Sequence, residues 1–407
     1  MNDSRKNAAV PGWDPSSPEV RRDQVAAFDD MRARCPMAHS DQLHWSVFGH
    51  RDVSRVLHDP ATFSSAVSAT HVSVPNGLEG ALHAEFRRII DPYFAAQEMA
   101  AFEPKCRALA IAAVERLPSN HDVEVMAEFA PRYALAALSL FLDWPREFQQ
   151  PLMHWIRRNQ QARCSGDAAA MRAVAAEFDG YVREVLVLRR RGVVEQENDV
   201  VTRLLSERVH GRAITDEELV SLLRVWTAGE LATVAASVGI LVGYLAGHAG
   251  FQAKLRAHPA ILPEAIDEIL RIHPPLLTSR RKTLRETHIG GQTIPAGEIL
   301  TLMWATANRD PAVFAEPAKM RLDRNPADNL LYGAGLHACP GAPLSRLTLR
   351  VLVEELLRSW RIQPATTIVP VNAFYPAAGF QILGARFVAA ADPGQGAREA
   401  APAEYPP

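Results

Sequence analysis

The stretch LLYGAGLHACPG, residues 330–341, guides the interpretation of the whole chain. It places Cys339, one of four cysteines, in a glycine-rich backbone two residues after His337. The helix-like segment that follows Gly341 would bring amide groups near the thiol, and such amides favour a thiolate. A thiolate in a permissive loop suits haem iron, for which cysteine is an axial ligand. The alternative is an ordinary glycine turn around a small buried residue.

Composition excludes several classes of protein. The chain has 407 residues, 48% of them hydrophobic, and a net charge of −2, so it can bury a large core and lacks the basic excess of a nucleic-acid binder. The cysteines show no CxxC spacing, which argues against zinc fingers and disulfide frameworks and favours a reducing cytoplasm. The N-terminus lacks an apolar signal region, so we expect no signal peptide and no membrane anchor.

Hydrophobic periodicity predicts a mainly α chain with small β-sheets. The longest predicted helix starts at Thr215, where Glu218 completes a capping box, and runs to about Ala246 through the core of a soluble protein. Further predicted helices are 16–34, 51–59, most of 79–250, and 262–273 before Pro274. Predicted non-helical segments are a strand at 43–50, a loop at 62–78, and a hairpin within 276–304 that turns at Gly290-Gly291.

The loop also carries a family resemblance. YGAGLHACPG resembles the haem-ligand signature F-G-x-G-x-H-x-C-x-G of the cytochrome P-450 superfamily, with Tyr332 in place of the first Phe. Further matches extend this resemblance over residues 12–388. It implies a bacterial, soluble protein with the P-450 fold, a single large domain of triangular helical architecture over 12–389. Short tails are then expected at 1–11 and 390–407.

The resemblance implies haem b as the cofactor, with Cys339 as the iron ligand and Gly341 beside it in the loop. The places that hold haem propionates in the family fall on His83, Arg87, Arg281 and His337. Arg280 is an open alternative to Arg281, and HAEFRR by itself is equally typical of a solvated basic helix face. The E-x-x-R pair Glu268 and Arg271, with Arg324 as a third member, is structural in the family, and ANRDP at 307–311 matches another family segment.

One family motif is displaced. The long helix should carry A/G-G-x-D/E-T, an acid and an alcohol that deliver protons during oxygen activation, but the chain reads TAGELATVAAS. The acid place therefore falls on Leu231 and the alcohol place on Ala232. Glu230 and Thr233 are each one residue away, and because one residue turns a helix by about 100°, neither can directly replace its neighbour. A π-bulge near Gly229 would re-register one of them. The candidate catalytic residues are Ala228, Gly229, Glu230, Leu231, Ala232 and Thr233.

The resemblance implies an oxidoreductase, a cytoplasmic haem-thiolate monooxygenase that inserts one oxygen atom into a small to medium hydrophobic substrate. Electrons would come from a separate ferredoxin-type partner, which Arg346 and Arg350 could meet on the Cys339 side. Two alternatives stay open: a peroxide-driven enzyme, motivated by the displaced motif, and a haem-binding protein without turnover. Candidate pocket residues are Leu231, Ala232, Leu276, Leu277, Phe374 and Tyr375, each of which could equally belong to the core.

Overall fold

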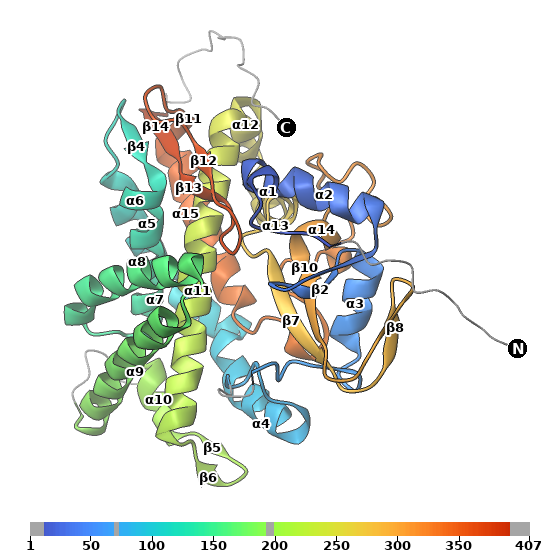
Figure 1. The fold of residues 1–407 in the computed structure, drawn as a ribbon. Helices are drawn as coiled ribbons and strands as arrows, with labels where there is room; N and C mark the ends of the chain where they lie inside the picture. Colours follow the sequence, from blue (N-terminus) through green and yellow to red (C-terminus); the bar gives the residue numbers. More distant parts are fainter. Residues whose placement is uncertain (1–11, 69–72, 193–198, 391–407) are drawn as a thin grey trace, which may run out of the picture.

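Helix α11 (Asp216–Gly247) is the longest element and crosses the helical part of the molecule (Figure 1). The computed structural model describes residues 12–68, 73–192 and 199–390. The predicted capping box is confirmed, since Thr215 Oγ1 accepts from the amide of Glu218 at 3.2 Å and Glu218 Oε2 accepts from the amide of Thr215 at 2.9 Å. These two bonds satisfy amide groups that the first helical turn leaves unpaired.

The apolar sequence of α11 is explained by packing on several sides. It contacts α7, α9, α13 and α15, and belongs to the main hydrophobic core. By length and hydropathy α11 could cross a membrane, as could the stretch Val125–Leu142, but 67% and 61% of their apolar windows are buried inside the structure. The prediction of a buried core helix is therefore confirmed.

The remaining helices surround α11 or cover the sheet. They are α1 (Pro18–Arg22), α2 (Gln24–Arg34), α3 (His50–His58), α4 (Gly80–Ile90), α5 (Ala96–Glu115), α6 (Val125–Glu128), α7 (Ala130–Leu142), α8 (Gln149–Ser165), α9 (Ala168–Arg190), α10 (Val200–Ser206), α12 (Ala249–Ala257), α13 (Leu262–Ile272), α14 (Trp304–Ala307) and α15 (Ala342–Ser359). Short 3-10 helices are η1 (Asp91–Phe94), η2 (Arg146–Phe148), η3 (Pro259–Ile261), η4 (Pro326–Asp328) and η5 (Gly335–His337).

The strands form one larger sheet and four small ones. The five-stranded sheet has the order β1-β2-β10-β7-β3, and a three-stranded sheet has the order β11-β14-β4. The strands are β1 (Met37–Ser40), β2 (His44–Val47), β3 (Phe63–Ser64), β4 (Asp122–Glu124), β5 (Arg208–Val209), β6 (Arg212–Ala213), β7 (Thr278–Thr283), β8 (Thr287–Ile289), β9 (Gln292–Ile294), β10 (Ile299–Met303), β11 (Trp360–Pro364), β12 (Val371–Asn372), β13 (Phe380–Ile382) and β14 (Gly384–Ala389). Figure 1 shows the larger sheet beside α2, α3 and α14, set apart from the helical part.

Several predicted elements need correction. The expected single helix at 16–34 is two helices, because Asp23 is extended and its carboxylate accepts from the amide of Ala26 to cap α2. The predicted loop 62–78 contains β3, and residues 69–72 of it lie outside the described residues. Strand β4 and the β5–β6 hairpin lie inside the region that was predicted as almost wholly helical.

Other predictions are confirmed. The predicted strand at 43–50 contains β2, and α3 and α13 end before Pro60 and Pro274. The β8–β9 hairpin turns at Gly290 and Gly291, which have φ of 54° and 79°. Both values are unfavourable for a side chain and allowed for glycine. The predicted tail 1–11 lies outside the described residues, as does the predicted tail 390–407 apart from Ala390, whose amide donates to the carbonyl of Ser359 at 3.0 Å.

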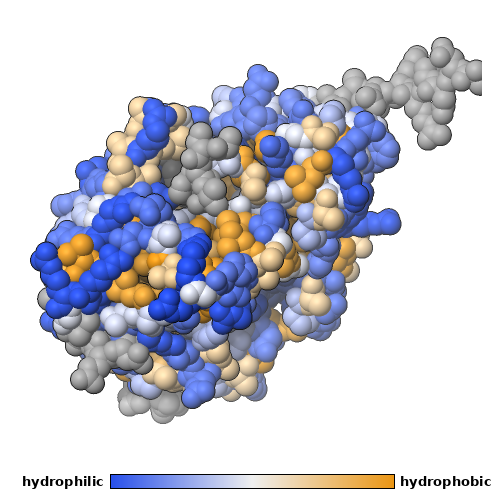
Figure 2. Space-filling view, turned by 90° about the horizontal axis from the view of Figure 1, so that it is seen from below, coloured by the Kyte–Doolittle hydropathy of each residue, from blue (hydrophilic) through white to orange (hydrophobic). Residues whose placement is uncertain are grey.

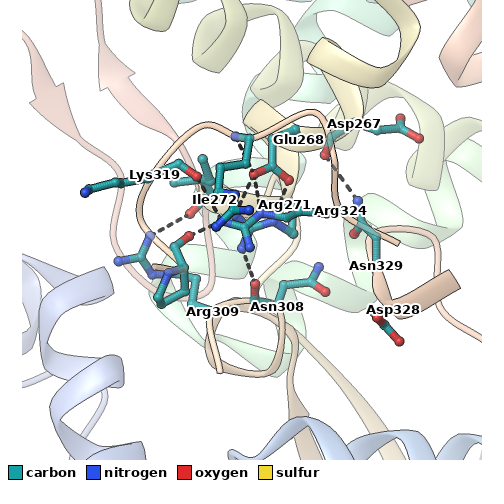
Figure 3. A network of polar contacts seen from close by, with 12 residues as sticks. Asp267, Glu268, Arg271, Ile272, Asn308, Arg309, Lys319, Arg324, Asp328 and Asn329 are labelled. Carbon is teal, nitrogen blue, oxygen red and sulfur yellow. Dashed lines mark hydrogen bonds and ion pairs between the residues drawn. The ribbon is translucent and has the colours of Figure 1, made fainter. Parts of the chain in front are cut away.

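The E-x-x-R pair lies at the centre of a buried polar network (Figure 3). Arg271 donates from Nε and Nη2 to the two oxygens of Glu268 at 2.7 and 2.8 Å, and Arg324 Nε donates to Glu268 Oε1 at 2.8 Å. Arg271 also donates to the carbonyls of Asn308 and Pro317 at 2.6 and 2.8 Å. The predicted three-residue ion-pair cluster is therefore confirmed as a structural feature.

Asn308 carries this network toward the Cys339 loop. Its side-chain oxygen accepts from the amide of Leu330 at 2.8 Å, at the start of the stretch 330–341. Its backbone carbonyl is the one that Arg271 binds. The ANRDP segment thus joins the ion-pair cluster to the loop that positions the thiol.

One face of the molecule is partly apolar. Figure 2, which views the molecule from below, shows hydrophobic residues gathered near the middle of this face within a surround of hydrophilic ones. Helix α4 and the β5–β6 hairpin lie on this side in Figure 1. Soluble proteins rarely expose large contiguous apolar patches without a binding role.

Candidate active site

The loop around Cys339 is held by its own backbone hydrogen bonds. The amide of Cys339 donates to the carbonyl of Tyr332 at 2.9 Å, and the amide of Gly333 donates to the carbonyl of Leu330 at 2.9 Å. The loop ends at Gly341, and α15 begins at Ala342. Cys339 is therefore fixed just ahead of a helix start, as the sequence predicts.

Two glycines of the loop are required by geometry. Gly333 and Gly335 have φ of 71° and 68°, and a Cβ on Gly335 would lie 2.4 Å from the carbonyl oxygen of Leu57. No side chain fits there without moving α3, because the contact is with backbone. Gly341 has an ordinary φ of −80°, and a Cβ there would lie 4.0 Å from Cys339 Sγ. Neither backbone conformation nor a close contact within the chain therefore requires glycine at position 341.

Cys339 is exposed, and neighbouring groups of the protein shift the pKa of its thiol. Burial and the nearby Glu230 carboxyl raise the pKa of Cys339, and the amides of Gly341 and Ala342 that hydrogen-bond the sulfur oppose this. The amide effect has the expected direction, but in the haem-free chain the desolvation cost exceeds it. The expectation that amides at the helix start lower the pKa of the thiol is therefore confirmed in direction.

Three candidate cofactor-binding residues meet next to this loop. Arg87 donates from Nη1 to the carbonyls of Leu336 and Ala338 at 3.2 and 2.9 Å, and pairs with Asp91 at 2.7 Å. The rings of His83 and His337 lie 4.3 Å apart. Residues His83 and Arg87 of α4 therefore face the Cys339 loop, rather than forming a solvated basic face.

His83 carries an unsatisfied polar atom in this cluster. Its side chain is 1% exposed, and its Nδ1 atom has no hydrogen-bond partner within the described part of the chain. Burial, with the nearby His337 and Arg87, lowers the pKa of His83 to about 4. A buried orphan nitrogen needs a partner, and a bound carboxylate would supply one.

The structure separates Arg281 from Arg280. They alternate along β7, so Arg280 is exposed and donates to the carbonyl of Gln42 at 3.2 Å, while Arg281 is only 8% exposed. Among the described residues the Arg281 side chain makes one hydrogen bond, to the carbonyl of Arg280, and burial lowers its pKa while the Glu79 carboxylate opposes this. Arg281 is thus the buried cation near His337.

Helix α11 runs without interruption through the displaced motif. Every residue from Asp216 to Gly247 is α-helical, so α11, which is fully described, has no π-bulge near Gly229 that would re-register the motif. The Thr233 hydroxyl donates back to the carbonyl of Gly229 at 2.7 Å, within its own helix. Thr233 is therefore not re-registered into the alcohol place.

The exposure pattern along α11 shows which candidates face open space. Gly229 and Ala232 are exposed, and Ala228 is half-buried. Leu231 is 3% exposed and packs in the main core. Leu231 therefore belongs to the core rather than to a pocket, which corrects that prediction, and the alcohol place presents only the methyl group of Ala232.

Glu230 points toward α15 and not along the helix. Ser345 Oγ donates to Glu230 Oε2 at 2.8 Å, and burial of the carboxyl raises the pKa of Glu230 to about 7. The same carboxyl influences Cys339 and Tyr332 electrostatically. The displaced acid is thus directed toward the region of the thiol.

Comparison with known proteins places this geometry in a family. The family model described as Cytochrome P450 matches residues 164–380, more than half of the chain. This chain is a cytochrome P450. Members of the family bind haem b through a cysteine thiolate, so the cofactor prediction and the fold-class prediction are confirmed.

Three similar proteins illustrate the range of the family. Linalool 8-monooxygenase of Pseudomonas putida is 25% identical, over 77% of this chain and 82% of that protein. Erythromycin C-12 hydroxylase of Saccharopolyspora erythraea is 27% identical, over 82% and 87%. The crystal structure of CYP108D1 from Novosphingobium aromaticivorans superposes with a TM-score of 0.79 at 27% identity, over 90% of this chain and 94% of that one. Such homologues are named monooxygenases, hydroxylases and epoxidases, and this P450 is an oxidoreductase of that class.

The residues present fit a haem. The exposed Cys339 can supply a thiolate, and the orphan Nδ1 of buried His83 can supply a hydrogen bond. Buried Arg281 is a positive charge without an ion-pair partner among the described residues. These are the groups that iron and two carboxylates require. The exposed Gly229 and Ala232 leave room beside α11.

Several residues of the site were missed by sequence reasoning. Ser345, which binds Glu230, is one of many serines at helix starts and gives no signal. The Tyr332 ring lies 4.5 Å from the guanidinium of Arg346, a cation–π contact that the Phe of the family signature could also make. Glu79 lies outside every quoted motif, yet its Oε2 is 3.4 Å from Nε2 of His337.

The remaining pocket and partner predictions are only partly supported. Leu277 is 2% exposed and packs in a small core cluster beside Tyr375, whereas Leu276 is exposed. Arg346 pairs with Asp267 at 2.9 Å, and Arg350 pairs with Glu103 at 2.6 Å. Both arginines are thus partly neutralised within the chain. They line a surface pocket of about 440 Å³ with Phe94, Met99, Ile266 and Leu347.

Glu230 makes the stability of this P450 depend on pH. An acid with an ordinary pKa of 4.5 when unfolded and about 7 when folded binds more protons in the folded state. Stability should therefore fall as the pH rises from about 4.5 to 7, by at most about 3 kcal/mol, and stay low above that. We expect Glu230→Gln, which can still accept from Ser345, to flatten this dependence in urea unfolding at pH 5 and pH 8.

The control is Glu115→Gln, which removes an exposed carboxylate from α5. It should leave the difference between pH 5 and pH 8 unchanged. If Glu230→Gln retains the full pH dependence of the parent protein, the buried carboxyl is not its source.

Proposed function

We propose that this P450 inserts one oxygen atom into a small to medium apolar substrate, by hydroxylation or oxidative dealkylation, with electrons from a separate ferredoxin-type protein in the cytoplasm. The observation that supports it most directly is the accessible Cys339 thiol beside an α11 face that presents Gly229 and Ala232. The catalytic domain is proposed to span 12–389. Relatives named for linalool and erythromycin support an organic substrate without fixing its size.

Each part of the chain has a proposed role. Cys339 holds the iron, and His83, Arg87, Arg281 and His337 hold the two propionates. A bound haem with thiolate ligation supplies the oxidising chemistry, because electron donation from sulfur favours cleavage of an O–O bond. The residues of α11 then exclude bulk water and orient the substrate over this centre.

Proton supply is the unusual feature of the site. The acid place holds a core leucine and the alcohol place holds Ala232, while Glu230 is bound to Ser345 and Thr233 to the carbonyl of Gly229. Both polar side chains therefore already have a hydrogen-bond partner within the chain. This favours ordered water or the substrate as the proton source, and it motivates a second candidate function, a peroxide-driven enzyme.

The test compares two oxidants on one substrate. A screen of apolar compounds for a spin-state shift of the haem absorption first identifies a ligand. We expect product with NADPH, a ferredoxin and its reductase. Product with hydrogen peroxide alone and none with the ferredoxin system would establish the peroxide-driven reaction and contradict the first proposal. Tight binding with no oxidised product from either oxidant would support a haem-binding protein without turnover.

A further inference from the structure

Glu79 places a carboxylate of the chain inside the cluster of cations near the Cys339 loop. It precedes α4 at the N-cap position, yet its side chain makes no capping hydrogen bond. Its Oε1 instead accepts from the hydroxyl of Ser64 at 2.9 Å and from the amide of Ser65 at 2.6 Å. Its Oε2 lies 3.4 Å from Nε2 of His337. These three contacts hold the carboxylate in one position.

The carboxylate of Glu79 interacts electrostatically with the buried Arg281. The Glu79 carboxylate favours the charged form of Arg281 and so opposes the effect of burial on the pKa of that group. It acts in the same sense on His83 and His337. An anion so placed lowers the free energy of a chain that has to bury a cation.

Before haem binds, the positive and negative side chains of this cluster nearly balance in charge. Arg87 is already paired with Asp91 at 2.7 Å, and Arg281 is offset by Glu79. A haem adds two carboxylates to this balanced set, so the carboxylate of Glu79 then repels a group that needs the same arginine.

We propose that Glu79 is a charge-balancing residue, which stabilises Arg281 in the haem-free chain and weakens the hold on a haem propionate in the loaded protein. This rests on the proposed assignment of Arg281 to a propionate. Glu79 acts through Arg281 and His337, so it is a positioning residue and not a catalytic one. Its charge sets how readily haem leaves.

The proposal predicts effects of opposite sign on the two forms of the protein. Glu79→Gln keeps an oxygen that can accept from Ser64 and Ser65 and removes only the charge. We expect haem transfer to excess apomyoglobin to slow by roughly threefold to tenfold, from loss of one partly screened repulsion. The haem-free chain should unfold at a lower urea concentration than the parent. A purely structural role for Glu79 would instead destabilise both forms.

Three further variants separate the role of Glu79 from the assignment of Arg281 to a propionate. Ser64→Ala removes the hydroxyl bond without changing charge, and Glu85→Gln removes a half-buried carboxylate that pairs with Arg88 on the same helix. Neither should slow haem loss. Arg281→Leu tests the assignment itself, since it should accelerate haem loss. If Arg281→Leu leaves haem loss unchanged, the propionate assignment is wrong. If Arg281→Leu accelerates it but Glu79→Gln does not slow it, only the role of Glu79 is wrong.

Discussion

Replacing Cys339 with alanine is expected to abolish the thiolate signature of the haem completely. The reduced, carbon monoxide-bound protein should lose the red-shifted Soret band that a cysteine thiolate produces, since Cys35 and Cys106 are buried and contact Met31 and Tyr133 instead. The methyl group of alanine fits where the Cβ of Cys339 lies, so the backbone bond to Tyr332 should survive. Haem bound in the variant would therefore show a different axial ligand, and product formation should fall to the background rate.

Cys35→Ala provides the matched control. Cys35 is a buried thiol that donates to the carbonyl of Met31, in a cluster with Phe28. This variant loses a thiol of similar size without touching the loop, so its spectrum should match that of the parent. A thiolate-type band that persists in Cys339→Ala and vanishes in Cys35→Ala would show that Cys35, and not Cys339, is the iron ligand.

The Cys339 loop could be predicted from sequence because its residues are constrained individually. Gly335 admits no side chain against the backbone of Leu57, so its identity carries structural information. The same is true of Glu268 and Arg271, whose spacing puts a carboxylate and a guanidinium on one helix face. Such features depend on backbone conformation or on helical spacing, both of which are local properties.

Features set by long-range packing could not be predicted. Strand β4 has three residues, and β5 and β6 have two each, so their conformation depends on their partners more than on propensity. The direction of Glu230 likewise depends on Ser345, which lies 115 positions away. Arg280 and Arg281 look equivalent in sequence until β7 is paired with β10, and strand alternation then buries only the second.

The displaced motif shows where resemblance and geometry differ. Alignment assigned the acid place to Leu231, and the structure buries that leucine in the core, where a carboxylate would be costly. The packing of α11 therefore tolerates an apolar residue at this place better than an acid. This geometry is the basis of our proposal that proton delivery relies on groups other than the acid and alcohol of the family motif.

Replacing Arg271 with alanine is expected to have the largest effect on stability of any change considered. The Arg271 side chain is buried and binds Glu268 through two nitrogens, so its loss leaves a buried carboxylate served mainly by Arg324 and strips two backbone carbonyls of a donor. Breaking a buried pair in this way costs about 3–5 kcal/mol. We expect urea unfolding to show a loss of this size, or a variant that does not fold.

Arg271→Lys keeps the result interpretable if the alanine variant does not fold. Lysine retains the charge but cannot form the bidentate contact, so we expect a smaller loss, on the order of 2 kcal/mol, together with reduced haem content. Haem content should fall because Arg271 holds the carbonyl of Asn308, whose side chain holds Leu330 at the start of the Cys339 loop.

Arg321→Ala is the matched control for this prediction. The Arg321 side chain is exposed and pairs with Asp323, while its backbone amide, which the substitution leaves in place, donates to Glu268 at 3.2 Å. Because exposed ion pairs contribute little, this variant should lose no more than about 1 kcal/mol. Equal losses in Arg271→Lys and Arg321→Ala would mean that the buried network is not what couples the fold to the thiol loop.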